Sequence, residues 1–410
     1  MPNLFSMKKP SICFFEGRMN GVEFYRSRQP MSMLAKAGWK VTMIPGVTDL
    51  LNASPEAMAM MTQSDILYKT APTAPYLIPF VTMKDLDATA KEMGGEGLKA
   101  QSFIFDWDDN NFAIPPYNPM YLFYGLNNAY ITLPGQPKLP LFEDGKTYWY
   151  EDATGRRRVK FDVAANRNNL DALQKLMQLA DVCTSTTPYL STELTKVRGS
   201  STDLSNTFKV VPNAVDDEIF IPYAGAKDPS IINLVWTVSS SHVIDFNKIK
   251  PFIGELMRKY KNLHLHLVGQ QFETNRDIPL SRLHVHTWVP DVPTYAAELG
   301  SFQADIGIAW VNDTEFNRNK SPLKAAEYMA MKIPVCTSQT VYGDHLTNGT
   351  DALLAATPEE FAGNLEKLIL SADLRKHLVE GGDNTYRTKY STDAVLPILE
   401  RTFYDALSKS

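Results

Sequence analysis

Short runs of apolar, β-branched and aromatic residues alternate along the chain with longer segments whose apolar residues recur at helical spacing. In the first half of the chain, the runs that predict strands are residues 11–15, 40–44, 64–68, 102–106 and 181–185. Helical patterns lie between them, as in residues 24–37 and 169–180. Alternation of this kind is typical of a parallel sheet that is covered by helices.

A second series of the same kind follows. Its predicted strands are residues 232–237, 263–269, 282–288, 304–310 and 333–338. Its predicted helices lie near residues 243–260, 295–299, 323–331 and 358–370. The chain is therefore expected to form an α/β protein with two Rossmann-like domains.

The boundary between the two series lies where a predicted strand ends at a Pro-Asn turn, and we place a hinge near Pro212. The expected domains are residues 1–212 and 213–390, and a helix in residues 391–410 is expected to pack back on the first domain. Residues 131–162 break the alternation and predict a β-hairpin that projects from the first domain.

Composition narrows the class of protein. The 410 residues are 44% hydrophobic and 21% charged, which is typical of a folded globular protein, and the net charge of −5 argues mildly against a general polyanion partner. Cys13, Cys183 and Cys336 lie far apart in apolar stretches, as buried thiols do in a reducing compartment. No run resembles a signal-peptide core or a membrane span, so we expect a cytoplasmic protein.

Ligands of doubly wound sheets bind where strands end and helices begin, so these loops hold the candidate site residues. After the first predicted strand, Gly17 and Gly21 would let the backbone approach a donor closely, although a plain strand-to-helix turn explains them equally well. Tyr25 and Arg26, in the helix that follows, are predicted to contact the acceptor.

Three carboxylates end the fourth predicted strand in the sequence FDWDDNNF. Asp106, Asp108 and Asp109 would repel one another unless a cation, sugar hydroxyls or backbone donors hold them, so we predict that they are catalytic. The alternative is a helix or turn cap, for which one acid would suffice. Contact with a sugar or an acceptor is favoured over a metal site.

In the second domain, Ser239, Ser240 and His242 follow the strand VWTV at the start of a helix. Hydroxyl groups and helix N–H groups there suit a diphosphate, although serine is also an ordinary helix cap.

A stronger signal lies in the sequence NRNKSPLKAAEYMAM, where three cations surround the start of a helix. Arg318, Lys320 and Lys324 predict an anion at this place, and Asn319 and Ser321 lie among them. Glu327, one turn beyond Lys324, could accept bonds from ribose hydroxyls. The alternative is an exposed helix with a weak Lys324–Glu327 pair.

Four histidines occupy alternate positions of two consecutive predicted strands. His264 and His266 share one face of the first strand, and His284 and His286 share one face of the second. Their convergence would suit zinc, but mid-strand positions under helices favour buried histidines, so no metal site is predicted.

Taken together, these motifs resemble the double-Rossmann (GT-B) glycosyltransferases of the family 4 type found in bacteria and bacteriophages. The resemblance covers nearly the whole chain, and its most specific part is ADIGIAWVNDTEFNRNKSPLKAAEYMAMKIPVCTS. It implies two parallel sheets that face each other across a cleft. It also implies transfer of a hexose or pentose from a nucleotide-diphosphate sugar, most simply a UDP-sugar, with retention and without an obligatory metal.

The resemblance also implies residue roles in donor binding. Glu327 would hold the ribose, and Thr287, Trp288 and Val289 would lie against the base. Many family members have a second glutamate where this chain has Asn319, and an arginine and a lysine where it has Ser239, Ser240 and His242. Arg318 and Lys320 are expected to replace that charge.

The acceptor is left open by the sequence. The predicted hairpin sets Trp149 among aromatic residues beside Arg156, Arg157 and Arg158, a composition that suits stacking on bases and contact with phosphates. Because phage relatives glycosylate hydroxylated bases of their DNA, modified DNA in the host cytoplasm is one candidate. A cell-surface saccharide or lipid-linked acceptor is the other. A nucleotide-sugar epimerase and a non-catalytic binding protein stay open as alternatives.

Overall fold

The computed structural model describes residues 9–15, 21–44, 55–71, 101–127, 142–143, 147–151, 157–199, 208–239, 242–269 and 277–408. Three predicted site residues, Gly17, Ser240 and Arg156, lie outside the described residues. For Trp149, Arg157 and Arg158 the structure describes the strands but not the side chains.

The chain forms two compact units. The first unit consists of Met1–Asn110, Asn168–Ala214 and Thr392–Ser410, and the second consists of Asn111–Arg167 and Val215–Ser391. The segment that carries the predicted hairpin, which we expected to project from the first domain, therefore groups with the second unit.

The first unit is built on a sheet of six parallel strands in the order β2-β1-β3-β4-β8-β9. These are β1 (Ser11–Phe15), β2 (Lys40–Ile44), β3 (Ile66–Thr70), β4 (Ser102–Trp107), β8 (Val182–Ser185) and β9 (Phe208–Val210). Strands β1, β2, β3, β4 and β8 lie within two residues of their predicted positions, and β9 is the strand expected before the Pro-Asn turn. The register sets Thr70 beside Asp106 and Asp106 beside Thr184, so the carboxyl ends of the central strands are level.

Helices cover this sheet. They are α1 (Gly21–Glu23), a π-helical turn (Phe24–Arg28), α2 (Gln29–Lys36), α3 (Pro55–Gln63), α6 (Val163–Leu179), α7 (Pro188–Arg198) and α15 (Thr392–Leu407). The segment predicted as one helix, residues 24–37, thus begins with a π-helical turn, and Pro30 lies in the first turn of α2. The hydroxyl group of Thr187 caps α7 by accepting from the N–H of Leu190.

The last helix, α15, belongs to the core of the first unit. Phe403 is fully buried and contacts the rings of Trp39 and Tyr68, with centroid distances of 6.0 and 5.7 Å. The indole N–H of Trp39 donates to Glu400 at 2.7 Å. Helix α15 therefore completes the apolar core of the first unit, although the strands of that unit end at Val210, far earlier in the sequence.

The second unit repeats the architecture with strands in the order β12-β11-β10-β13-β14-β15, all parallel. These are β10 (Ile232–Thr237), β11 (Leu263–Gly269), β12 (Leu283–Thr287), β13 (Ile306–Ala309), β14 (Val335–Ser338) and β15 (Ala352–Ala355). Two six-stranded parallel sheets confirm the predicted pair of Rossmann-like domains. Strand β15 is additional to the prediction.

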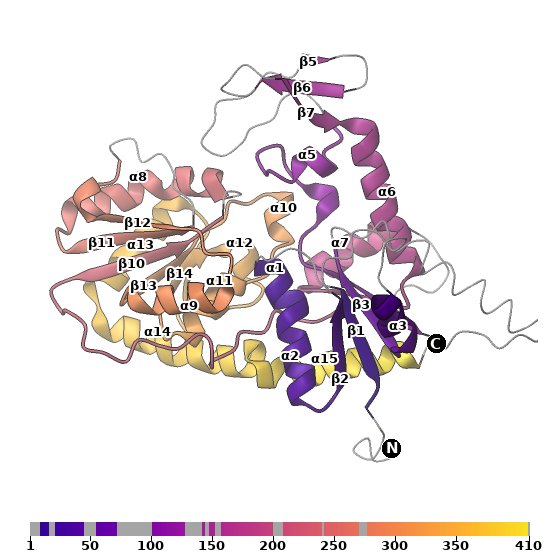
Figure 1. Ribbon diagram of the computed structural model, residues 1–410. Coiled ribbons are helices and arrows are strands. Elements are labelled where there is room, and N and C mark those ends of the chain that lie inside the picture. The colour runs from indigo at the N-terminus through magenta and orange to yellow at the C-terminus, as the bar shows by residue number, and fades with distance from the viewer. Residues whose placement is uncertain are drawn as a thin grey trace, which may run out of the picture. The chain divides into compact units, whose positions relative to one another are not determined.

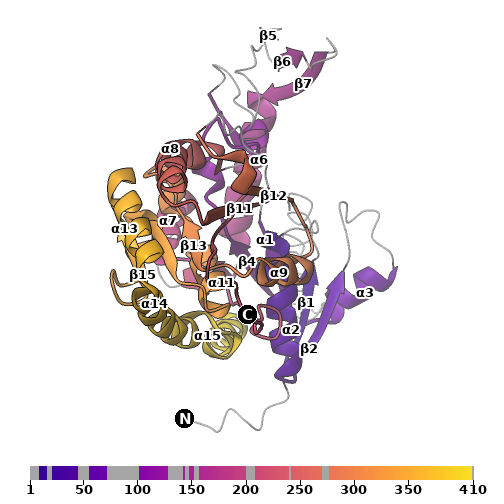
Figure 2. The ribbon, with the colours of Figure 1, turned by 90° about the vertical axis from the view of Figure 1, so that its left-hand side faces the viewer.

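The helices of the second unit are α8 (Val243–Lys259), α9 (Val292–Ser301), α10 (Glu315–Arg318), α11 (Leu323–Ala330), α12 (Gln339–Tyr342), α13 (Pro358–Leu370), α14 (Ala372–Thr385) and a π-helical turn (Tyr386–Tyr390). Figures 1 and 2 show α8 and α13 on one side of the sheet and α9 and α11 on the other. Phe246 of α8 and Phe361 of α13 are fully buried in one apolar cluster with Trp236 of β10.

The remaining part of the second unit, Asn111–Arg167, contains a 3-10 turn (Asn111–Ala113), α5 (Tyr121–Tyr124) and a separate antiparallel sheet. This sheet has the order β5 (Phe142–Glu143), β6 (Thr147–Glu151) and β7 (Arg157–Asp162). The two strands of the predicted hairpin are β6 and β7, and β5 adds a third strand.

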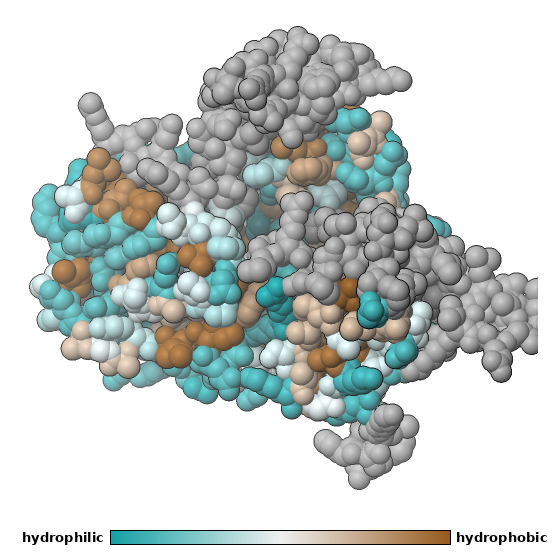
Figure 3. Space-filling model, viewed as in Figure 1, coloured by the Kyte–Doolittle hydropathy of each residue, from teal (hydrophilic) through white to brown (hydrophobic). Residues whose placement is uncertain are grey.

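The surface of the second unit mixes polar and apolar residues. On the face drawn in Figure 3, apolar residues form separate patches among hydrophilic ones, as is ordinary for folded proteins. Within the described part of the chain, no helix is long and apolar enough to cross a membrane.

The packing of α15 generates a stability prediction. Replacing Phe403 with alanine removes a fully buried ring and should lower the free energy of unfolding by about 3–5 kcal/mol. The exposed Arg401 on the same helix provides the matched control, and Arg401→Ala should change the value by less than about 0.5 kcal/mol. Urea denaturation measures both, and equal effects would show that α15 does not stabilise the core.

Candidate functional site

The connections of the second sheet mark where a ligand would bind. The chain leaves β10 toward β11 and β12 on one side and returns to β13 on the other side of β10. At such a switch point two adjacent loops diverge and leave a crevice beyond the carboxyl ends of the strands. In this chain the two loops at the switch point follow Thr237 and Ala309.

Asp245, in the first turn of α8, organises these two loops. Its carboxylate accepts a hydrogen bond from the backbone N–H of Asn312 at 2.7 Å and pairs with the Nδ1 of His242 at 2.8 Å. The amide of Asn317 donates to the carbonyl group of Asn312 at 3.0 Å and reaches Asp245 at 3.4 Å. Asp245 is 3% exposed. It thereby fixes the ring of His242 beside the predicted diphosphate position, a role that the sequence did not reveal.

Glu327 of α11 is fully buried. Its Oε2 accepts from the hydroxyl group of Tyr295 at 2.9 Å and from the Nζ of Lys324 at 3.0 Å. Burial and the charge of Glu327 raise the pKa of Tyr295 well above its ordinary value, so its phenol stays protonated and donates. Because Lys324 is about one third exposed, this buried carboxylate lies one side chain away from solvent. The alternative of an exposed helix with a surface pair is therefore wrong.

The side chains just before α11 separate into two groups. Arg318 is exposed, and its guanidinium binds both oxygens of Asp313, at 2.6 and 2.8 Å. Asn319 is fully buried, and its amide donates to the carbonyl group of Glu315 at 2.7 Å. Neither geometry supports the predicted donor contact, because a carboxylate already neutralises Arg318 and the backbone of α10 holds Asn319.

Lys320 and Ser321 are better placed for an anion. The Nζ of Lys320 lies 4.7 Å from the centre of the Phe316 ring, and Lys320 and Ser321 are half-buried. They immediately precede α11, whose first N–H groups carry partial positive charge. The local charge at this helix start therefore comes from Lys320, Lys324 and the helix itself.

A glycine allows α11 to lie close to the sheet. At Gly307 of β13 an added Cβ would lie 2.6 Å from the ring of Tyr328, so any larger residue would displace α11. The hydroxyl group of Tyr328 in turn accepts from the backbone N–H of Thr237, at 3.1 Å. Gly307 and Tyr328 thus fix the distance between α11 and the end of β10.

The predicted base-binding residues follow β12 directly. Thr287 and Trp288 are exposed, and Val289 is half-buried. The ring of Trp288 lies against the end of β11, where Gly269 has a φ of +107° and an added Cβ would meet Trp288 at 2.9 Å. An exposed indole beside a backbone without a side chain provides a flat apolar surface at a strand end, as a nucleobase requires.

In the first unit, an ion pair occupies the carboxyl end of β4. Arg26 and Asp106 are 1% and 0% exposed, and the guanidinium donates to both oxygens of Asp106 at 2.9 and 2.5 Å. Arg26 also donates to the carbonyl group of Val211 and to Asn213, and Thr184 donates to Asp106. Both charges thereby join the π-helical turn before α2, the end of β4 and the segment that follows β9.

This geometry corrects three predictions. Arg26 and Tyr25 are buried and cannot reach an acceptor directly, and Asp106 is enclosed by its partners rather than open to substrate. Asp108 and Asp109, by contrast, are half-buried just beyond β4. The amide of Asn213 donates to Asp108 at 3.3 Å. Two of the three predicted carboxylates therefore lie where a substrate could reach them. Gly21, at the start of α1, is half-buried with open space around its Cα.

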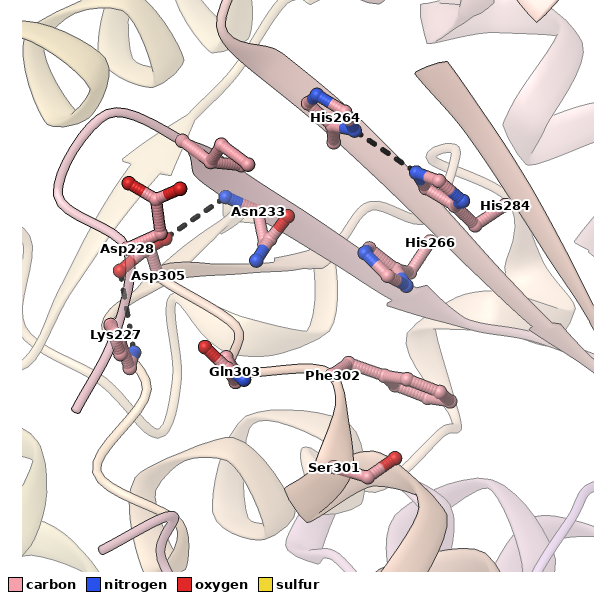
Figure 4. A pocket seen from close by; sticks show the side chains of 11 residues that line it. Lys227, Asp228, Asn233, His264, His266, His284, Ser301, Phe302, Gln303 and Asp305 are labelled. Carbon is pink, nitrogen blue, oxygen red and sulfur yellow. Dashed lines mark hydrogen bonds and ion pairs between the residues drawn. The ribbon is translucent and has the colours of Figure 1, made fainter. Parts of the chain in front are cut away.

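The four histidines are less buried than predicted. All four are half-buried, and His264, His266 and His284 line a pocket of about 430 Å³ (Figure 4). The pocket lies near the amino-terminal ends of β10 and β11, because it includes Asn233 and His264. Among the described residues, no group of three or more His, Cys, Asp and Glu side chains is arranged to hold a metal ion.

Comparisons with known proteins place this geometry in context. Residues 247–371, which include α11 and β12, match the model of a family described as glycosyl transferases group 1. No curated protein sequence matches the chain.

Solved structures of similar fold cover nearly the whole chain. A glycosyltransferase from Rickettsia africae is 12% identical, with a TM-score of 0.60, over 98% of this chain and 100% of that one. HepE from Anabaena in complex with UDP is 10% identical, with a TM-score of 0.58, over 97% and 100%. A sucrose-phosphate synthase from Thermosynechococcus elongatus is 13% identical, with a TM-score of 0.56, over 98% and 100%. At these identities the likeness establishes the GT-B fold.

The two ion pairs described above generate a prediction about stability. Asp106→Asn leaves the buried Arg26 without its counter-charge and should lower the free energy of unfolding by about 3–5 kcal/mol. Asp313→Asn breaks the exposed pair with Arg318 and should cost less than about 1 kcal/mol. Chemical denaturation of both variants makes the comparison. A small effect of Asp106→Asn would mean that the pair does not hold the π-helical turn, β4 and the segment after β9 together.

Proposed function

We propose that the protein is a glycosyltransferase that moves a sugar from a UDP-sugar to the hydroxyl group of an acceptor, with retention at the sugar carbon. The observation that carries the proposal is the buried Glu327, held by Tyr295 and Lys324 beside the switch point of the second sheet. Three further findings support it: the match of residues 247–371 to group 1 glycosyltransferases, the GT-B fold, and the UDP and UDP-glucose complexes of HepE.

In this proposal the second unit binds the donor. The base lies on Trp288 and its neighbours, and the ribose hydroxyls donate to Glu327. The diphosphate meets Lys320, Lys324 and the start of α11 on one side, and Ser239 with His242 on the other. Cations and helix N–H groups suit the charge that develops on the departing phosphate when the sugar–phosphate bond breaks.

The first unit contributes the acceptor side. As the acceptor oxygen bonds to the sugar carbon, which carries positive charge, the bond from that carbon to the diphosphate breaks. UDP leaves with the electron pair of that bond, and its phosphate oxygen takes up the proton of the acceptor hydroxyl group. We assign Asp108 and Asp109 to this side, because they are the half-buried carboxylates at the end of β4. Asp106 and Arg26 act only through position, by fixing β4 and Asn213, which donates to Asp108.

The acceptor class rests on sequence alone. The aromatic and basic residues of β6 and β7 suit a hydroxylated base in phage DNA, and the same aromatic residues suit a saccharide or a lipid-linked sugar. The experiment measures release of UDP with hydroxymethylated DNA, with bacterial saccharides and without either. The substrate that increases the release identifies the acceptor class. An epimerase would instead convert the free donor without any acceptor.

Glu327→Gln tests the ribose contact. Loss of a charged acceptor should weaken binding of both UDP and uridine by about 10- to 100-fold, since a hydrogen bond to a charged group contributes about 1.5–3 kcal/mol. Isothermal titration calorimetry measures the two affinities. Glu359→Gln, at an exposed position of α13, is the matched control and should bind as the unaltered protein does. Unchanged affinity in a folded Glu327→Gln protein would exclude the ribose role.

Lys320→Ala tests the phosphate contact separately. It should weaken UDP binding by about 10-fold or more and leave uridine binding nearly unchanged, because only UDP carries the diphosphate. Lys376→Ala, at an exposed position of α14, removes the same charge elsewhere. Equal losses for UDP and uridine would contradict a specific role at the diphosphate.

Asp108→Asn separates chemistry from binding. If Asp108 acts at the reacting centre, transfer should fall by at least about 100-fold while UDP affinity stays unchanged. Steady-state release of UDP and calorimetry give the two values. Full transfer activity in this variant would remove Asp108 from the reaction.

A further inference from the structure

The pocket at the amino-terminal ends of β10 and β11 is lined by imidazoles that the proposed transfer does not use. We call His264, His284, His266 and His286 the histidine file, in the order in which they lie. Their ring centres are 5.3, 4.6 and 5.3 Å apart, alternating between β11 and the edge strand β12. The ring of Phe302 closes the file, 4.1 Å from that of His286.

Two contacts within the file are hydrogen bonds between imidazoles. The Nδ1 of His264 lies 3.0 Å from the Nε2 of His284, which Figure 4 marks with a dashed line. The Nδ1 of His266 lies 3.1 Å from the Nε2 of His286. A contact of this kind holds one proton, which one ring donates and the other accepts. When both rings of a pair are protonated, two N–H groups face each other and the contact becomes repulsive.

The histidine file borders a pocket, and few carboxylates near it could balance the positive charge of added protons. The charged side chains that line the pocket are Lys227, Asp228 and Asp305, and Lys227 already pairs with Asp305 at 3.3 Å. The backbone and hydroxyl group of Ser230 donate to Asp228. From neighbouring elements, Arg282 adds a positive charge near His264, and Glu298 adds a negative charge near His286.

The folded chain resists protonation of the file. Burial, followed by the neighbouring imidazoles, lowers the pKa of His266 to about 3. Burial is also the main cause of the lowered pKa values of His264 and His286. Below the ordinary value of 6.5, the unfolded chain therefore takes up more protons than the folded one. The stability that these groups contribute is complete above pH 6.5 and is lost as the pH falls from there.

The position of the file connects it to the donor site. Among the described strands, β12 pairs with β11 only, so the backbone hydrogen bonds and side-chain contacts between these two strands help to hold it in place. The register sets Thr287 beside Gly269, directly beyond the file, and Trp288 follows. A change in the attachment of β12 therefore reaches the proposed base-binding residues through one continuous strand.

We propose that mild acid loosens β12, because imidazoles released from the histidine file take up protons that the packed file excludes, and that this loosening lowers the affinity of the donor site for UDP. The effect on β12 stands on the file alone, and the effect on UDP rests on the proposed function. The file thus makes donor binding sensitive to pH in the range in which imidazoles titrate.

The test replaces one pair with amides that keep a hydrogen bond but do not titrate, as His264→Asn with His284→Gln. Between pH 7.5 and pH 5.5, the unfolding temperature of the unaltered protein should fall by roughly 5–10 °C. The double variant should lose about a third less, because one of the three imidazoles with a lowered pKa no longer titrates. His377→Gln, which alters an exposed histidine of α14, should behave as the unaltered protein does. Equal losses in all three proteins would overturn the proposal.

The second pair, His266→Asn with His286→Gln, repeats the test independently if the first variant does not fold. Calorimetry with UDP at both pH values then measures coupling to the donor site. Between the two pH values, the affinity for UDP should fall about 10-fold more in the unaltered protein than in the double variant. Because both proteins bind the same nucleotide, the titration of its phosphate cancels in this comparison. Identical slopes would overturn the coupling. Absence of UDP binding at pH 7.5 would contradict the proposed function, while the unfolding temperatures would still decide the role of the file.

Discussion

In both units all six sheet strands run parallel, so their carboxyl ends and the loops that follow them meet at one edge of each sheet. The order of the strands also matters. In each sheet the chain starts at a central strand, continues on one side of it and later returns to the other side, so that loops from distant parts of the chain become neighbours. In the second unit this constraint brings the carboxylate of Asp245 to the backbone N–H of Asn312, which lies 67 residues further along the chain. No local preference of these residues would do so.

Buried charge is used differently in the two units. Asp106 is enclosed by Arg26 and Thr184, so its carboxylate joins elements of the first unit and faces no solvent. Glu327 is equally buried, but one of its partners, Lys324, is about one third exposed. An arriving hydroxyl group could compete for Glu327 by displacing Lys324, whereas nothing could compete for Asp106 without opening the core. This difference is why we propose Glu327 as a binding residue and Asp106 as a positioning residue.

The sequence predicted the strands well because buried parallel strands are short apolar runs between helical patterns. It missed β15, whose sequence Ala-Leu-Leu-Ala is as typical of a helix as of a strand. It predicted that the histidines share one face of neighbouring strands, since this follows from the period of two. Whether a helix covers that face depends on the path of α9 and Phe302, which periodicity does not give.

The site could be predicted in part for a related reason. Lys320, Lys324 and Glu327 lie within eight residues of one another, so their pattern is visible in sequence. Tyr295, which holds Glu327, and Asn213, which donates to Asp108, come from distant elements and have no local signal. The same holds for Arg26, whose partner Asp106 lies eighty residues away. Contacts between distant residues decide which members of a motif are enclosed.

The most direct test of the central claim is a crystal structure of the protein grown with UDP. The account predicts the nucleotide at the carboxyl edge of the second sheet, with its ribose hydroxyls on Glu327 and its diphosphate at the start of α11. Nucleotide bound elsewhere on the protein, or a ribose that makes no contact with Glu327, would contradict it.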